Sequence, residues 1–156
     1  MENDQAEHQE LFRIIAENTM DTIVVADHQG VVLYVSPSLF DLLGYRADEY
    51  KGTDAFRVIH PEDRAYTRAM HRRALETRQA VDLEYRALHA QGHVIHIEAR
   101  VKPVLNHEGE VRYVVVAARD VSERKQAEEF LEKILDNVRA AVFSVDKDFT
   151  RYYYLS

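Results

Sequence analysis

Histidines and carboxylates are the residues of this chain whose types and spacing come nearest to a chemical site. His89, His93 and His96 lie close together, and imidazole nitrogens are common ligands of zinc and other transition metals. They lie around a glycine-containing turn, however, at strand positions with polar neighbours. Solvated histidines are therefore the better interpretation, and no metal site is predicted.

The adjacent carboxylates Glu62 and Asp63 invite comparison with a catalytic acid and base. They follow Pro61 at an expected helix start, where negative charge complements the helix dipole, and neither has apolar surroundings that would raise its pKa. His60 is likewise interpreted as part of this helix start. Because no nucleophile, base and orienting group come together, we predict no catalytic residue and do not expect an enzyme.

Composition narrows the function further. The absence of cysteine excludes disulfides, thiolate metal sites and cysteine nucleophiles, and it fits a reducing compartment. A net charge of −7 argues against binding to nucleic acid. No apolar run is long enough to span a membrane, and the acidic, polar N-terminus is unlike a secretory signal. We therefore expect a cytoplasmic globular protein.

The five glycines divide the chain into short elements. Gly30, Gly92 and Gly109 follow polar residues between apolar or alternating runs, which predicts hairpin turns. Gly44 and Gly52 each close a short apolar or amphipathic stretch, as helix C-caps do. No glycine remains to cradle a phosphate, so no nucleotide-binding loop is predicted.

Hydrophobic periodicity predicts five strands around these turns. Residues 22–27 and 31–36 form the first pair, and polar and apolar residues alternate along 81–87 and 95–102. Residues 111–119 are apolar on both faces, which is typical of a central strand.

Helical patterns occupy the remaining segments. Ser36 and Pro37 are predicted as the N-cap and first residue of a short helix, and Pro61 opens a longer one. An amphipathic helix lies within residues 1–20, and from Asp120 the hydrophobic period becomes helical again behind a sequence that resembles a capping box. The predicted order is α-ββ-(short α)-α-βββ-α, an α+β fold with an antiparallel sheet.

Four sequence motifs, in this order, resemble a PAS domain with its C-terminal PAC segment. They are IIAENTMDTIVVADHQGVVLYVSPSLFDLLGY, VIHPEDR, VDLEYRALHAQGHVIHIEARVKPV and AARDVSERKQAEE, and they extend over roughly residues 11–129. The resemblance implies a PAS fold, in which a five-stranded antiparallel sheet faces helices across a small internal cavity. It also implies a sensory or dimerising role in a larger protein, commonly a histidine kinase or diguanylate cyclase.

An internal repeat indicates how the domains are organised. The pattern Ile-x-x-Asn, followed by an apolar pair and an aspartate, begins at Ile15 and again at Ile134. We expect an N-terminal amphipathic helix over 1–20, a PAS domain over 21–120, a signalling helix over 121–138 and the first strands of a truncated second PAS domain over 139–156. The chain is therefore expected to be part of a longer protein with a C-terminal effector domain.

Strand alternation, with the family pattern for the strands that are apolar on both faces, predicts which side chains face the cavity. Phe40, Phe56, Ile59 and Met70 are expected to close its helical side, and the strand candidates are Val24, Ala26, Tyr85, Ala87, Ile97, Ala99, Val116 and Ala118. Tyr85 is the one polar side chain among these strand candidates, so a ligand would be small and mostly apolar. Alternatively, these residues simply fill the core.

The resemblance also bears on cofactors. Flavin-photochemical PAS domains need a cysteine, which this chain lacks, and the position of the axial histidine of haem-binding members falls on Thr67. His71 lies one helical turn further on and could still enter the cavity, although a helix-surface or pocket-edge position is the preferred interpretation. We therefore expect no haem, flavin or metal.

We accordingly predict a sensory and dimerisation module that passes a conformational bias through its C-terminal helix. Asp120, Ser122 and Glu123 are the expected relay, and a homodimer is expected to form through Leu11, Phe12, Ile15, Ala127, Leu131, Ile134 and Val138. Two alternatives remain open: a constitutive protein–protein scaffold with a filled cavity, and a haem-type gas or redox sensor.

Overall fold

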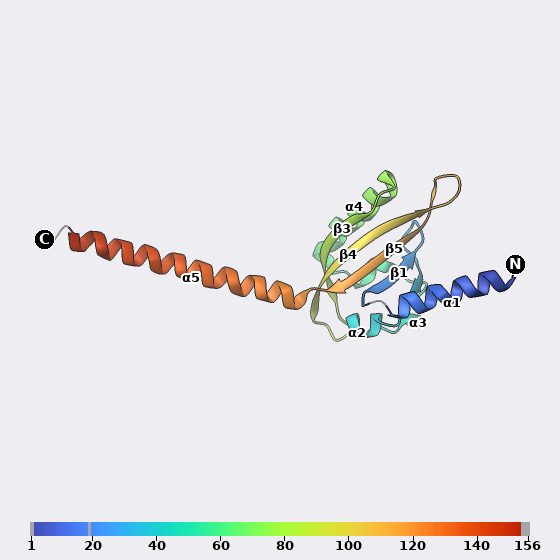
Figure 1. The fold of residues 1–156 in the computed structure, drawn as a ribbon, viewed down its shortest axis with the longest axis horizontal. Helices are drawn as coiled ribbons and strands as arrows, with labels where there is room; N and C mark the ends of the chain where they lie inside the picture. Colours follow the sequence, from blue (N-terminus) through green and yellow to red (C-terminus); the bar gives the residue numbers. More distant parts are fainter. Residues whose placement is uncertain (1, 19, 154–156) are drawn as a thin grey trace. The chain divides into compact units, whose positions relative to one another are not determined.

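The computed structural model describes the backbone of residues 2–18 and 20–153, and the side chains of residues 6–17 and 20–141. The element order is the predicted one (Figure 1). The elements are α1 (Glu2–Asn18), β1 (Thr22–Ala26), β2 (Val32–Val35), α2 (Leu39–Leu43), α3 (Ala47–Tyr50), the 3-10 helix η1 (Ala55–Val58), α4 (Pro61–Thr77), β3 (Val81–Leu88), β4 (Val94–Leu105), β5 (Val111–Asp120) and α5 (Ser122–Tyr153). The chain divides into two compact units after Val121.

The first unit is built on one antiparallel sheet of five strands in the order β2-β1-β5-β4-β3. The strand that is apolar on both faces, β5, lies in the middle, which confirms the sequence prediction. It pairs with β1 on one side, where Val24 lies opposite Val116, and with β4 on the other, where Val101 lies opposite Val116. The predicted α+β fold with a five-stranded antiparallel sheet is thereby confirmed.

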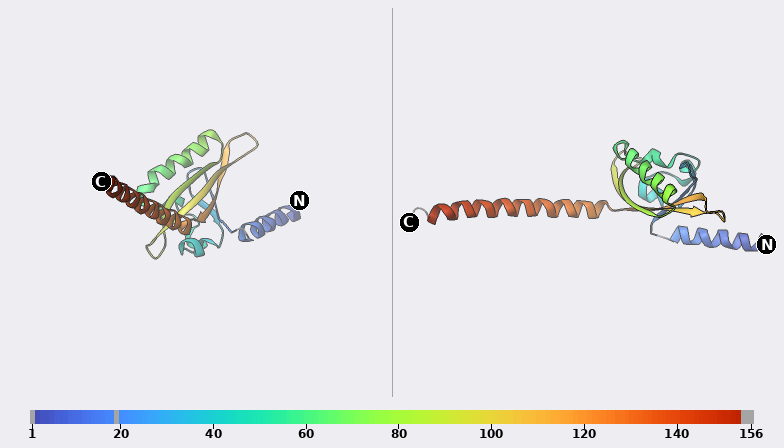
Figure 2. Two further views of the ribbon diagram at one scale, coloured as in Figure 1. Left: turned by 60° about the vertical axis from the view of Figure 1, so that its left-hand side comes forward. Right: turned by 90° about the horizontal axis from the view of Figure 1, so that it is seen from above.

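The hydrophobic core lies between one face of the sheet and the helices α2, α3 and α4, which cover that face (Figure 2). Alternation along β4 shows how the strands contribute: Ile97 and Val101 are buried, whereas Arg100 and Lys102 are exposed. Each inward side chain removes apolar surface from water, which is the main favourable contribution to folding. The same alternation determines which strand residues face the cavity.

The predicted helix start at Ser36 is wrong. The helix α2 begins at Leu39 after Ser38, and Ser36 is fully buried. The Ser36 hydroxyl oxygen accepts a hydrogen bond from the Ile23 amide at 2.9 Å and is hydrogen-bonded to the Ser38 hydroxyl at 2.8 Å. Ser36 therefore joins the end of β2 to β1, because a buried hydroxyl must find its partners locally.

The strands predicted within 139–156 are not observed in the described part of that range: α5 continues as a helix through Tyr153. A pair of strands buries too little surface to be stable alone. A helix satisfies its backbone hydrogen bonds internally, so it does not depend on a neighbouring sheet. Residues 154–156 lie outside the described residues. The internal repeat itself stays a prediction.

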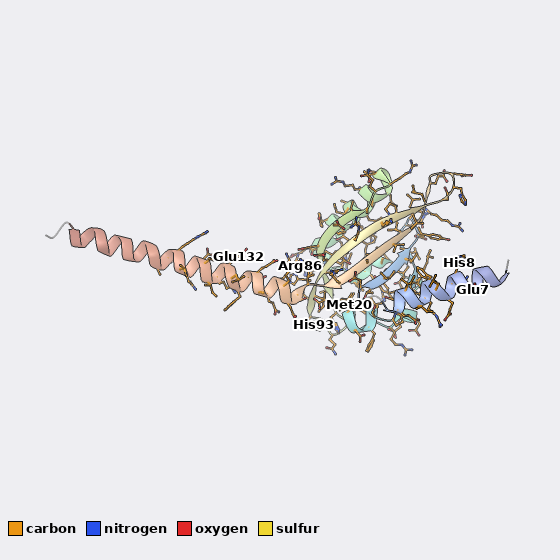
Figure 3. All side chains as sticks on the ribbon, viewed as in Figure 1. Glu7, His8, Met20, Arg86, His93 and Glu132 are labelled. Carbon is orange, nitrogen blue, oxygen red and sulfur yellow. The ribbon has the colours of Figure 1, made fainter. Side chains whose placement is uncertain are left out.

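The start of α4 is held by its own cap and by an ion pair. His60 is the N-cap, and its Nδ1 accepts a hydrogen bond from the Glu62 amide at 3.2 Å. Asp63 binds Arg86 of β3 in a bidentate manner, with Oδ1 2.7 Å from Nη2 and Oδ2 3.0 Å from Nε (Arg86 is labelled in Figure 3). Hydrogen bonding to Arg86 lowers the pKa of Asp63 to about 2. The sequence analysis had assigned Asp63 to the helix dipole alone and missed this partner.

Candidate functional site: an internal cavity

A cavity of about 70 Å³ lies within the core, between the inner face of the sheet and the helices. Most of the predicted pocket residues line it: Val24, Ala26, Phe56, Ile59, Tyr85, Ile97, Val116 and Ala118. These residues come from the strands β1, β3, β4 and β5 and from η1 with its C-cap, so both strands and a helical segment meet at this cavity.

Four predicted pocket residues lie elsewhere. Phe40 is 58% exposed, because the short helix α2 turns Leu39 and Leu43 toward the core and Phe40 away from it. Met70 is partly buried against the core, whereas Ala87 and Ala99 are fully part of it without lining the cavity. Strand parity was right for both alanines, but parity does not locate the empty volume along the strand.

The sequence analysis missed further lining residues. They are Thr22, Gly30, Leu39, Leu42, Leu43, Tyr50, Ala55, Val58, Thr67, His71, Leu83, Val101 and Val114. Some had a usable signal, since Leu83 and Val101 share the parity of the predicted positions, and Leu39 and Leu43 form an apolar pair at helical spacing. For His71 a helix-surface position had been preferred, with a position at the cavity left open. It lines the cavity because α4 presents this side chain inward.

Some of the hydroxyl groups that line the cavity already have a hydrogen-bond partner within the described part of the protein, and one does not. The Tyr50 hydroxyl donates to the Ala55 carbonyl at 2.7 Å, and the Thr67 hydroxyl donates to the Asp63 carbonyl at 2.7 Å. Among the described residues, no group hydrogen-bonds to the hydroxyl of Tyr85. Tyr85 is thus the one lining hydroxyl with its donor and acceptor both unused.

The electrostatics of the cavity favour neutral molecules. Burial raises the pKa of Tyr85 to about 12 and raises that of Tyr50 as well, so both phenols are uncharged at neutral pH. Tyr85 lies on the inner face of β3, yet part of its surface is accessible, because that part faces the cavity. No Asp, Glu, Lys or Arg side chain lines the cavity in the described part of the chain. A charged ligand would therefore lose its hydration without gaining a countercharge.

The histidines near the β3–β4 turn do not form a metal site in the described residues. His89 and His93 stack with ring centroids 4.2 Å apart and planes inclined by 19°. No group of three or more potential metal ligands comes together among residues 6–17 and 20–141. The expectation that the chain carries no haem or flavin stays a prediction.

The predicted relay and dimer residues lie at the edges of the first unit and along α5. Asp120 is the last residue of β5, and α5 begins two residues later at Ser122, so Glu123 lies in its first turn. The predicted dimer residues Leu11, Phe12, Ile15, Ala127, Leu131, Ile134 and Val138 are all exposed.

One of these residues also contacts the sheet. Phe12 lies edge-on to Tyr34 of β2, with ring centroids 5.5 Å apart. The Tyr34 hydroxyl is buried and has no hydrogen-bond partner among the described residues. Burial also raises the pKa of Tyr34. The sequence analysis did not single out Tyr34.

Comparison with known proteins supports the fold and the class of function. The chain is 28% identical to a sensory box histidine kinase/response regulator from Burkholderia thailandensis, whose structure matches with a TM-score of 0.66 over 82% of this chain and 97% of that chain. The N-terminal domain of a diguanylate cyclase with a PAS/PAC sensor from Marinobacter aquaeolei is 25% identical, with a TM-score of 0.62 over 67% of this chain and 98% of that chain. The probable diguanylate cyclase DgcE of Escherichia coli is 35% identical over 98 residues, which are 58% of this chain and 9% of that protein.

The chain spans only part of its curated relatives, at 14%, 9% and 3% of the length of three that it matches. No helix among the described residues is long and apolar enough to cross a membrane. The family model for the PAS fold matches residues 32–118, which include β2, β3, β4, most of β5 and the helices α2, α3, η1 and α4. The chain therefore belongs to the PAS family, the family of sensor domains found in histidine kinases and diguanylate cyclases.

Proposed function

We propose that the chain is the sensory and dimerisation input module of a multidomain signal-transduction protein of the histidine kinase or diguanylate cyclase type. The state of its cavity biases the pairing of two copies, and α5 passes this bias to a C-terminal effector domain. The observation that carries the proposal is the Tyr85 hydroxyl, which faces an apolar cavity with no partner among the described residues. A ligand that accepts a hydrogen bond from this hydroxyl would gain roughly 0.5–1.5 kcal/mol, the net contribution of a typical hydrogen bond.

The ligand that fits this cavity is small, neutral and mostly apolar, with one hydrogen-bonding group. Its size follows from the volume of about 70 Å³, and its neutrality from the absence of charged lining side chains in the described residues. Haem and flavin are not part of the proposal, because the axial-histidine position of haem-binding PAS domains falls on Thr67 and the cysteine that flavin photochemistry needs is absent.

The proposed output is a parallel homodimer. Leu131 and Val138 are 58% and 52% exposed, and with Ala127 and Ile134 they recur at heptad spacing along α5. Exposed apolar area costs roughly 25 cal/mol per Å², so pairing these helices between two copies is favourable. A seam of only a few heptads is weak enough for a signal to change it.

A constitutive dimerisation scaffold is the second candidate. The cavity volume of about 70 Å³ favours it, because established ligand pockets are usually about 300–1,000 Å³. A scaffold would dimerise through the same helices, but the state of the cavity would not affect the dimer.

A titration with acetone, a neutral molecule with one acceptor, separates the two candidates. We expect amide NMR shifts at the cavity and a change in dimer affinity, and roughly five- to tenfold weaker binding to Tyr85→Phe, because one net hydrogen bond is lost. Tyr50→Phe is the matched control, since the Tyr50 hydroxyl already bonds to Ala55. Acetone binding without any change in dimer affinity would favour the scaffold. Equal affinity in both variants would remove Tyr85 from the site.

A further inference from the structure

One side chain lies between the cavity and the solvent. His71 lines the cavity from α4 and is partly buried, and its Nε2 lies 3.3 Å from the carbonyl oxygen of His28 in the β1–β2 turn, residues 27–30. Within residues 20–141, this is the one hydrogen bond that joins the turn to α4. It is also long for a hydrogen bond of this type. Closure of the cavity at this point therefore depends on a single weak contact.

The other side of the turn is fixed by its backbone. The Ala55 amide donates to the Gly30 carbonyl at 2.9 Å, and Val31 and Asp54 form an antiparallel bridge. Gly30, with φ of 89°, lies so close to Phe56 that an added Cβ would be 2.8 Å from Cε2 of that ring. The turn thus rests directly on η1, and its side toward α4 is the one that can open.

Phe56 has contacts that do not depend on His71. The His71 ring packs edge-on against Phe56 with ring centroids 5.4 Å apart. The guanidinium of Arg68 lies 4.3 Å from the Phe56 ring centroid and binds the Asp54 carboxylate at 2.7 Å. Rotation of the His71 side chain alone would therefore break the contact with the turn without displacing the neighbouring wall.

We propose that His71 is the gate of the cavity: its contact with His28 closes the passage between α4 and the β1–β2 turn, and its rotation into solvent admits a small molecule. The inference rests on the cavity of the proposed function. It concerns access to that cavity, whereas the proposed function concerns the consequence of occupancy.

The charges around His71 make the gate sensitive to pH. Burial is the largest cause that lowers the pKa of His71, and Arg68 on α4 lowers it too, whereas the bond to His28 and the carboxylate of Asp27 in the turn raise it. From η1, Asp54 faces this region, and its charge is paired with Arg68. In the open state His71 is solvated and recovers its ordinary pKa, so the open state binds more protons. Closure is therefore favoured above about pH 6.5 and weakens as the pH falls below it.

Xenon exchange tests the gate, because xenon enters small apolar cavities regardless of hydrogen bonding. By saturation-transfer ¹²⁹Xe NMR on the full chain, we expect the entry rate of the wild type to rise several-fold between about pH 7.5 and about pH 5.5. His71→Ala should exchange xenon roughly tenfold faster than the wild type at the higher pH and should show no pH response. His71→Gln keeps a donor for the His28 carbonyl but cannot titrate, so its entry should stay slow at both pH values. His93→Ala, on the β3–β4 turn, should behave like the wild type.

Equal entry rates in the wild type and His71→Ala, or a pH response that persists in His71→Gln, would overturn the gate, and so would the absence of xenon binding in every protein. If His71→Ala does not fold, the comparison of His71→Gln with the wild type decides the question. Ungated xenon entry combined with an acetone-dependent change in dimer affinity would reject the gate and retain the proposed function. Gated xenon entry without an acetone-dependent change in dimer affinity would retain the gate and reject the proposed function.

Discussion

The PAS core and α5 contain similar apolar side chains but differ in what surrounds them. Ile97 in β4 is 1% exposed, and its neighbours come from the strands and helices of the same chain. Ile134 in α5 is 42% exposed, and Leu131 and Val138 on the same face of the helix are more exposed still. A core is complete within one chain, whereas an amphipathic helix with an exposed stripe needs a second surface. Stability therefore depends mainly on the first region, and assembly on the second.

The same truncation in the two regions gives the largest expected contrast. Ile97→Ala should lower the free energy of unfolding of the core by about 3 kcal/mol, because it enlarges a cavity that rigid strands cannot collapse around. Ile134→Ala, the matched substitution in α5, should change it by less than about 0.5 kcal/mol. Urea unfolding followed by circular dichroism measures both. Similar losses in the two variants would show that α5 contributes to the core.

A charge in the α5 stripe tests assembly directly. Leu131→Glu should weaken the homodimer at least about tenfold, because pairing would bury an uncompensated carboxylate. Glu132→Gln, a change at the next residue of the same helix, is the control and should leave the dimer intact (Glu132 is labelled in Figure 3). Sedimentation equilibrium measures the affinity. A wild type that is monomeric at tens of micromolar, and unchanged by the substitution, would contradict the dimer.

The ion pair between Asp63 of α4 and Arg86 of β3 predicts a smaller effect, an acid-dependent loss of stability of the core. The pKa of Asp63 is lowered from 3.8 to about 2 in the folded state, so the unfolded state binds more protons between these values. The stabilisation is therefore complete above about pH 4 and is lost as the pH falls toward 2. Both partners are partly exposed, with side-chain exposures of 34% for Arg86 and 21% for Asp63, so solvent reduces the effect.

Thermal melts of the wild type and Asp63→Asn test this assignment. The variant should melt at a lower temperature near neutral pH, and the difference should shrink between pH 4 and pH 2. A difference that stays constant over that range would assign the loss to packing rather than to the charge.

The junction between the two regions gives the smallest expected change in stability. Asp120→Ala should cost at most about 1 kcal/mol, the typical effect of removing a helix cap. It should also reduce the acetone-dependent change in dimer affinity while the core keeps its unfolding midpoint. Unchanged coupling would remove Asp120 from the relay.

The sequence predicted the sheet well because strand alternation depends on neighbours that are close in the chain. Tyr85 and Ile97 were placed on the inner face by alternation alone, and β5 was placed centrally by its two apolar faces. The helical side of the cavity was predicted less well. Phe40 was misplaced and the position of His71 was left open, because short helices and polar helices carry too few apolar residues to show which face turns inward.

The end of α5 shows a different limit. The repeat of residues 15–27 near residue 134 is a property of the sequence, but strand pairing depends on neighbouring strands. Residues 139–153 accordingly form a helix, although the same pattern forms β1 after residue 20. Local pattern determines which structure is accessible, and tertiary context decides which one forms.

The pairing of β1 with β5 has a consequence for how such a domain is carried along a polypeptide. Thr22, at the start of β1, lies opposite Ala118, near the end of β5, so the chain enters and leaves the sheet on adjacent strands at the same end of the sheet. Neighbouring strands are only about 4.8 Å apart. The whole domain therefore adds little distance between the segments that precede and follow it. Insertion or tandem duplication of such a domain lengthens the gene far more than it separates the flanking segments.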